Sequence, residues 1–310
     1  MHEFSATLGN KHVLNIIQLP EWPPLIHTMV LVSYLLLAIS LLCTWLPQHP
    51  RRWMIITALM ALCTASLCDT ILTTGVATLL VLLGLAILSV KFSRYRQILL
   101  ISIFSLLAIA LSLHVLPGFN NLAVIEHQQL KPDSAFFSLW LNFDKPWIAW
   151  IILFAFKPAL LRNLNQWRTA LVKAWLPLLT TLTLTMLLAA NVGLIHWLPA
   201  VPPYAMTFLA INLIFTCVAE ECFFRIVVQN QLHERLRHLR HGEVLAIVTT
   251  GCLFGLAHAG GGGSYIAVAT VAGVGYAWVY QRSGSLEMAI LAHWLLNTLH
   301  FIGFTYPVAV

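Results

Sequence analysis

Two adjacent glutamates, Glu220 and Glu221, stand in an apolar run that reads AINLIFTCVAEECFFRIVVQNQL. Arg225 follows Glu221 by four residues, so on a helix these two side chains share a face and can form an ion pair. Glu220 then points about 100° away. Two carboxylates against one guanidinium leave an excess negative charge, so the second carboxylate must take up a proton or find another partner. We therefore treat Glu220 as a candidate for chemistry.

Histidine and asparagine side chains stand in two later apolar runs. Phe254 and His258 are four residues apart in VTTGCLFGLAHAGGGG, and His293 and Asn297 are four apart in LEMAILAHWLLNTLHF, so each pair faces one direction on its helix. At 1.5 Å per residue, Glu220 lies about 22 Å from the predicted cytoplasmic helix end, with His258 and Asn297 at similar depths. The sequence therefore allows these polar groups to meet.

The composition excludes an ordinary soluble domain. The chain of 310 residues is 59% hydrophobic and 9% charged, whereas soluble domains carry about 25% charged residues. The net charge of +6 comes from short basic clusters between apolar runs, which indicates membrane topology and no nucleic-acid partner. The cysteines form no CxxC pair, so we expect neither a disulfide framework nor a zinc knuckle; they are Cys43, Cys63, Cys68, Cys217, Cys222 and Cys252. No cleavable signal peptide is evident in the first 24 residues, which contain Pro20 and Pro23.

Ten apolar runs predict an all-α protein, a polytopic integral membrane bundle of about ten transmembrane helices. The stretch from Trp53 to Val90 is too long for one crossing, and Asp69 with the segment 73–75 offers the turn. Residues 1–200 would form an N-terminal region of about six helices without a motif. Residues 201–310 would form a catalytic core of about four helices. The runs are residues 25–47, 53–69, 74–90, 97–117, 146–161, 174–197, 204–228, 244–260, 264–281 and 285–305.

Basic residues alternate between the two sets of predicted loops. One set receives several clusters, whereas the other receives Lys11, Lys131 and Lys145. This asymmetry is the positive-inside pattern and predicts a multi-pass protein of the plasma membrane with both termini outside the cytoplasm. The segment 118–146 is the one long loop and is expected on the outer side as a connector. The clusters are Arg51 and Arg52; Lys91, Arg94 and Arg96; Arg162, Arg168 and Lys173; Arg235, Arg237 and Arg240; and Arg282.

Three short motifs, in this order, resemble the signature of the CPBP family, which comprises CAAX prenyl endopeptidases and bacteriocin-processing or immunity-type membrane proteins. They are Glu220-Glu221-x-x-x-Arg225, Phe254-x-x-x-His258 and His293-x-x-x-Asn297. The resemblance covers roughly residues 203–305. It implies that Glu220 and His258 activate the hydrolytic water, while His293 and Asn297 hold the water or stabilise the oxyanion. Glu221, Arg225 and Phe254 would support them.

The residues leave the role of a metal open. A carboxylate with two histidines, here Glu220, His258 and His293, can ligate Zn²⁺ and leave a position for water. The chain lacks HExxH, the usual helical pair of zinc proteases. We expect a metal-independent mechanism with no cofactor.

Two functions remain in view. The first is an intramembrane endopeptidase that acts on a membrane-associated protein or peptide within the lipid bilayer. The second is a non-enzymatic immunity or assembly factor, or an ion-coupled transporter that uses the buried carboxylates. The complete motif set favours hydrolysis, and the absence of an internal repeat in the sequence disfavours a transporter.

Overall fold

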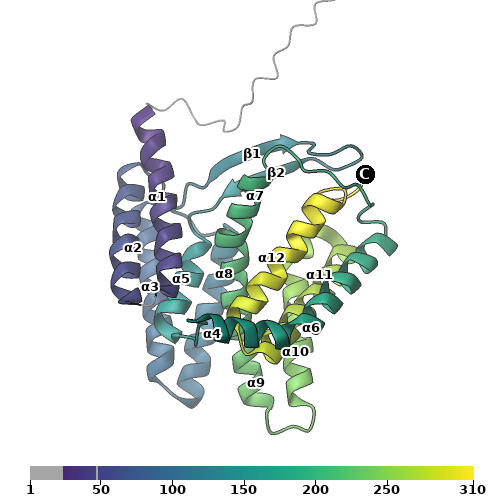
Figure 1. Ribbon diagram of the computed structural model, residues 1–310. Helices are drawn as coiled ribbons and strands as arrows, with labels where there is room; N and C mark the ends of the chain where they lie inside the picture. Colours follow the sequence, from purple (N-terminus) through teal and green to yellow (C-terminus); the bar gives the residue numbers. More distant parts are fainter. Residues whose placement is uncertain (1–23, 47) are drawn as a thin grey trace, which may run out of the picture.

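The computed structural model describes residues 24–46 and 48–310, and Figure 1 shows their arrangement. Within these residues the chain forms ten helical stretches, which correspond in order to the ten predicted apolar runs. The predicted features before Pro24, including Lys11, Pro20 and an outer N-terminus, lie outside the described residues.

The first four helices pack as two antiparallel pairs, α1 with α2 and α3 with α4. Their bounds are α1 Pro24–Leu42, followed by a 3-10 turn over Cys43–Trp45, α2 Pro50–Leu67, α3 Thr73–Lys91 and α4 Arg94–Ser112. The predicted turn near Asp69 is confirmed, because α2 ends at Leu67 and Asp69 takes a left-handed backbone conformation with φ 55°. Asp tolerates that conformation better than most residues.

The all-α prediction missed a β-hairpin in the segment 118–146. Strands β1 (Leu122–Gln128) and β2 (Phe137–Leu141) pair antiparallel with irregular register. Each strand is shorter than the apolar runs that identify a membrane helix, so the search for long runs passed over them. The C-terminal residues join this layer, since the backbone N–H of Ala135 donates to the carbonyl oxygen of Val308.

Helix α5 (Pro146–Phe156) is shorter than the predicted run 146–161. Pro146 stands at its first turn, and Lys157 ends it in a left-handed conformation with φ 50°, directly before Pro158. At 1.5 Å per residue its 11 residues span about 16 Å, roughly half of a bilayer core. Apolar residues lie around its whole circumference, and nearly all are buried, so α5 is an internal helix.

The second half of the chain surrounds a long helix that runs from Ala205 to Leu236. This helix consists of α7 (Ala205–Ile211), a π-helical segment, α8 (Val218–Glu221), a second π-helical segment and α9 (Asn230–Leu236). Helix α6 packs on α11, and α11 packs on α10 and α12. Their bounds are α6 Leu164–Asn191, α10 Gly242–Ala257, α11 Gly262–Ser283 and α12 Leu286–Gly303.

Five helices in the described residues are long and apolar enough to cross a membrane, namely α1, α3, α4, α6 and α11 with the turn before it. The protein is therefore an integral membrane protein, while the crossing of all ten helices stays a prediction. The hairpin and the C-terminus lie at one end of the molecule, and the turn between α9 and α10 lies at the other (Figure 1). That turn carries the predicted cytoplasmic residues Arg237 and Arg240.

Candidate active site

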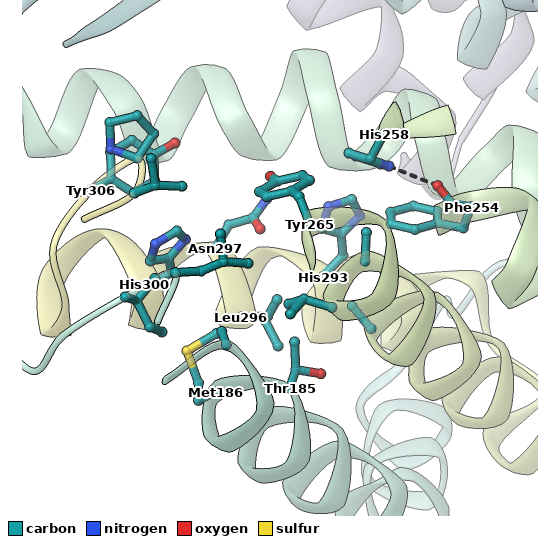
Figure 2. A pocket seen from close by; sticks show the side chains of 18 of the residues that line it. Thr185, Met186, Phe254, His258, Tyr265, His293, Leu296, Asn297, His300 and Tyr306 are labelled. Carbon is teal, nitrogen blue, oxygen red and sulfur yellow. Dashed lines mark hydrogen bonds between the residues drawn. The ribbon is translucent and has the colours of Figure 1, made fainter. Parts of the chain in front are cut away.

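The four residues singled out by the sequence line one cavity of about 230 Å³ between α6, the α7–α9 helix, α10, α11 and α12. Glu220, His258, His293 and Asn297 all contribute to its wall. Figure 2 shows His293 and Asn297 along α12, with Tyr265 and Phe254 beside them. The structure thus brings together side chains from helices that are far apart in the sequence.

The two glutamates occupy a single α-helical turn between two π-helical segments. Helix α8 ends with Glu220 and Glu221, and the π-helical segments on either side cover Asn212–Cys217 and Cys222–Gln229. π-helical turns are rare and occur frequently at functional sites. Glu220 faces the cavity, whereas Glu221 is fully buried behind it, so the predicted difference in direction is confirmed.

Glu221 connects the arginine of the first motif to the histidine of the third. Its Oε2 atom lies 2.9 Å from Nε of Arg225, which confirms the predicted ion pair. Its Oε1 atom lies 2.8 Å from Nδ1 of His293. Arg225 also donates to the side chain of Gln229, which in turn donates to the carbonyl oxygen of Ala277 on α11. The pair is completely buried, and its neighbours hold it in place.

The tautomer of His293 follows from these contacts. A carboxylate that is paired with a guanidinium can only accept a hydrogen bond, so Nδ1 of His293 carries the proton and donates it to Glu221. In the neutral ring Nε2 is then the acceptor, and it lies 3.9 Å from Oε2 of Glu220. The ring stacks on Tyr276 with centroids 4.7 Å apart, which fixes its plane.

Glu220 has a partner that the sequence reasoning did not identify. Nζ of Lys145 donates to Oε1 of Glu220 at 2.5 Å, and the side chains are only 15% and 14% exposed. The Oε2 atom of Glu220 is buried and has no hydrogen-bond partner among the described residues. One oxygen is therefore held by a cation, and the other is available inside the cavity.

Lys145 was predicted to be an ordinary charge of the outer loop. In the structure it is the residue before the first turn of α5, and this buried helix begins at the depth of Glu220. The sequence offers a weak signal, because a charged Asp144-Lys145 pair directly precedes a strongly apolar helix. Nothing in that signal identifies Glu220, 75 residues later, as the partner.

His258 ends α10, and its ring direction is set by its own helix. Its Nδ1 atom lies 2.8 Å from the carbonyl oxygen of Phe254, a contact drawn in Figure 2. A carbonyl oxygen only accepts, so Nδ1 carries the proton and Nε2 is an acceptor. The Phe254 ring packs 4.6 Å from the His258 ring and 5.6 Å from the His293 ring, between centroids. Phe254 therefore separates and positions the two histidines.

Asn297 is oriented by Asn212 of the π-helical segment. Its Nδ2 atom donates to Oδ1 of Asn212 at 3.1 Å, and the same oxygen accepts from the Cys217 thiol. An amide NH₂ has two hydrogens. The same Nδ2 atom also makes a longer contact of 3.8 Å with Sγ of Cys217. Sulfur is a weak acceptor, so a stronger acceptor in the cavity can compete for this hydrogen.

The alternative ligand set for a metal does not form a metal site in the described residues, where no group of three His, Cys, Asp or Glu side chains has a suitable arrangement. One of the proposed ligands, Glu220, already binds the Lys145 ammonium. This ammonium would repel a metal cation at the same carboxylate.

Comparison with known proteins gives one family. Residues 202–299 match the family described as type II CAAX prenyl endopeptidase Rce1-like. No curated protein and no solved structure matches the chain. The matched segment contains Glu220, His258, His293 and Asn297 but not Lys145. Residues 202–299 are therefore an Rce1-like domain, consistent with a protease of the CPBP family.

Proposed function

We propose that this protein is an intramembrane endopeptidase that hydrolyses a peptide bond of a membrane-associated protein or peptide. The Rce1-like domain supports a peptidase of the CAAX type. The observation that carries the proposal is the Oε2 atom of Glu220, which has no hydrogen-bond partner among the described residues and lies 3.9 Å from Nε2 of His293 inside the cavity. This separation suits one water that hydrogen-bonds to both atoms.

In the proposed reaction, that water attacks the carbonyl carbon of the scissile bond. Glu220 takes a proton from the water through Oε2, while Nε2 of His293 accepts the other hydrogen and holds the attacking oxygen in position. His258 lines the same cavity and offers Nε2 as a second acceptor. General base catalysis of this kind contributes about 10²- to 10⁴-fold to the rate.

The developing oxyanion needs a fixed donor. Nδ2 of Asn297 supplies one, because Asn212 holds the amide in place and the oxyanion replaces the weak 3.8 Å contact with Sγ of Cys217. A positioned donor is most effective in a dry site, where it needs no reorganisation. When the C–N bond breaks, Glu220 returns the proton to the leaving nitrogen, and the products are a carboxylic acid and an amine.

The surroundings suit a substrate in or beside the bilayer. The polar groups lie among membrane helices, and the cavity wall also includes apolar side chains such as Met186 and Leu296. We propose that the protein resides in the plasma membrane with both termini outside the cytoplasm, and that residues 1–200 flank a catalytic core of residues 201–310. The substrate class is a membrane-associated polypeptide, without an assigned prenyl group.

Proteomics of membrane fractions tests this function. Cells carrying wild type, Glu220→Gln or His258→Ala are compared for new N- or C-terminal peptides of membrane proteins. We expect at least one protein to be processed with wild type and intact with both variants. A matched control is Glu126→Gln, which removes an exposed carboxylate on β1; processing should persist. If all stably inserted variants give the same protein termini as wild type, the peptidase proposal is refuted. The alternative is then a non-enzymatic immunity or assembly factor, or an ion-coupled transporter.

A further inference from the structure

Lys145 completes the charge balance of the site. The two adjacent carboxylates each have one cationic partner, Arg225 for Glu221 and Lys145 for Glu220. The guanidinium and Glu221 are completely buried, whereas the second pair keeps slight exposure to the cavity. The first pair belongs to the recognised motif, while the second is formed across 75 residues of sequence from outside the Rce1-like domain.

The position of Lys145 is fixed by the residues before it. Asp144 is 1% exposed, and its Oδ1 atom accepts the backbone N–H of Lys145 at 2.7 Å. Its Oδ2 atom lies 2.6 Å from Nδ1 of His114 at the end of α4. Asn121 donates to the same Oδ2 atom and accepts the backbone N–H of Phe143. The chain directly before the lysine is thus held by Asn121 and His114.

Aromatic packing anchors the start of α5. Phe143 is fully buried, with its ring 5.2 Å from Tyr34 of α1 and 6.1 Å from Trp147 between centroids. One turn further, Nε1 of Trp150 donates to Oγ of Ser40. These contacts fasten α5 to the N-terminal helices, so the first half of the chain determines where the ammonium lies.

A lone carboxylate among apolar side chains is neutral more readily than in water, because burial disfavours the charged form. A neutral acid cannot take a proton from water. Besides Lys145 on α5, the titratable groups facing Glu220 do not carry a fixed positive charge; they are Cys217 and Glu221 on its own helix, His258 on α10, Tyr265 and Tyr276 on α11, and His293 on α12. Lys145 therefore supplies the cation that an ionised Glu220 requires.

We propose that Lys145 is a positioning residue of the site: it keeps Glu220 ionised, binds Oε1, and so directs Oε2 to the water. This role rests on the proposed peptidase function and deepens it. It also gives the region before the Rce1-like domain a role in catalysis, because the hairpin and α5 in this region position the lysine.

The test compares Lys145→Met, Lys145→Arg and Lys157→Met in full-length purified protein. Lys157 is the exposed lysine at the other end of α5 and serves as the matched control. Infrared spectroscopy at neutral pH measures the protonated carboxylic acid band. We expect Lys145→Met to gain a band that disappears in Lys145→Met/Glu220→Gln, and Lys145→Arg and Lys157→Met to resemble wild type. Thermal unfolding verifies that each variant is folded.

The same variants are then assayed for processing of the substrate found by proteomics. Lys145→Met should lower the rate by about 100-fold, the contribution expected of a general base. Lys145→Arg should restore most of it. A folded Lys145→Met protein without the acid band, or with wild-type processing, would overturn the role of Lys145. If wild type processes nothing while the acid band behaves as expected, the peptidase proposal fails and the electrostatic role of Lys145 stands.

Discussion

Nδ1 of His293 lies 2.8 Å from Oε1 of Glu221, and Nε2 of the same ring lies 3.9 Å from Oε2 of Glu220. One imidazole therefore spans the two adjacent carboxylates. Glu221 fixes the tautomer from behind, so that the ring presents an acceptor to the cavity. The adjacent glutamates have different tasks because one is paired inside the helix bundle and the other faces the space where a water and substrate would lie.

Glu221→Gln should reverse the tautomer of His293. The amide can donate to Nδ1, which leaves the proton on Nε2 and removes the acceptor from the cavity. We expect the processing rate to fall by on the order of 100-fold or more. In serine proteases, neutralising the carboxylate that orients the catalytic histidine has an effect of at least this size. Nitrogen-15 chemical shifts of the His293 ring measure the tautomer directly, and an unchanged ring spectrum with reduced activity would contradict this account.

The same change leaves the Arg225 guanidinium buried without its carboxylate. We expect the free energy of unfolding to fall by on the order of 3 kcal/mol. The double variant Glu221→Gln/Arg225→Met should regain much of this stability but remain slow in processing. Thermal unfolding together with the activity assay separates the two effects, and recovery of both in the double variant would refute an orienting role for Glu221.

Asn297→Ala should affect the transition state more than substrate binding. Loss of one oxyanion donor lowers kcat by on the order of 100-fold, with little change in KM. Thr298→Ala is the control, since the Thr298 hydroxyl donates to the carbonyl oxygen of Trp294 on its own helix. An Asn297→Ala variant with a raised KM and an unchanged kcat would contradict the role of Asn297 as an oxyanion donor.

Lys131 joins the hairpin loop to the end of α12. Its Nζ atom donates to the carbonyl oxygens of Leu198, Ile302 and Phe304. Lys131→Met should therefore lower the free energy of unfolding by on the order of 2 kcal/mol, because three carbonyl oxygens lose their hydrogen-bond donor. A thermal midpoint equal to that of wild type would show that these bonds do not stabilise the protein.

Burial also lowers the pKa of Lys131 to about 8 from its ordinary value of 10.5. Between these pKa values the unfolded chain holds more protons than the folded one, so this group makes folding more favourable as pH rises. The stability advantage of wild type over Lys131→Met should be larger at about pH 10 than at about pH 7. An advantage that shrinks over that interval would contradict the lowered pKa.

Chelator treatment should leave processing unchanged, because the proposed base is a glutamate already paired with an ammonium. Elemental analysis of the purified protein should then give far less than one metal ion per chain. Activity that is lost on chelation and restored by Zn²⁺ would establish the alternative ligand set of Glu220, His258 and His293.

Periodicity and spacing predicted the parts that depend on neighbours along one helix. In the described residues, ten apolar runs correspond to ten helical stretches, and the Glu221 and Arg225 pair forms at a spacing of four. The other motif residues line one cavity; they are Glu220, Phe254, His258, His293 and Asn297. Helical geometry determines which side chains share a face, so these features follow from local sequence.

Features set by distant contacts were not predictable in this way. The contact between Lys145 and Glu220 depends on the early end of α5 and on the packing of Phe143 against α1. The hairpin has two short strands with irregular register, which give no long pattern. Sequence spacing also cannot place the π-helical segments on either side of α8, between which Glu220 lies.

The most direct test of Glu220 as the base uses purified protein in lipid vesicles with the identified substrate. Wild type should cleave one peptide bond, whereas Glu220→Gln, shown by thermal unfolding to be folded at the assay temperature, should be slower by about 10³-fold or more. Cleavage at the same bond by Glu220→Gln at a rate near that of wild type would contradict the account.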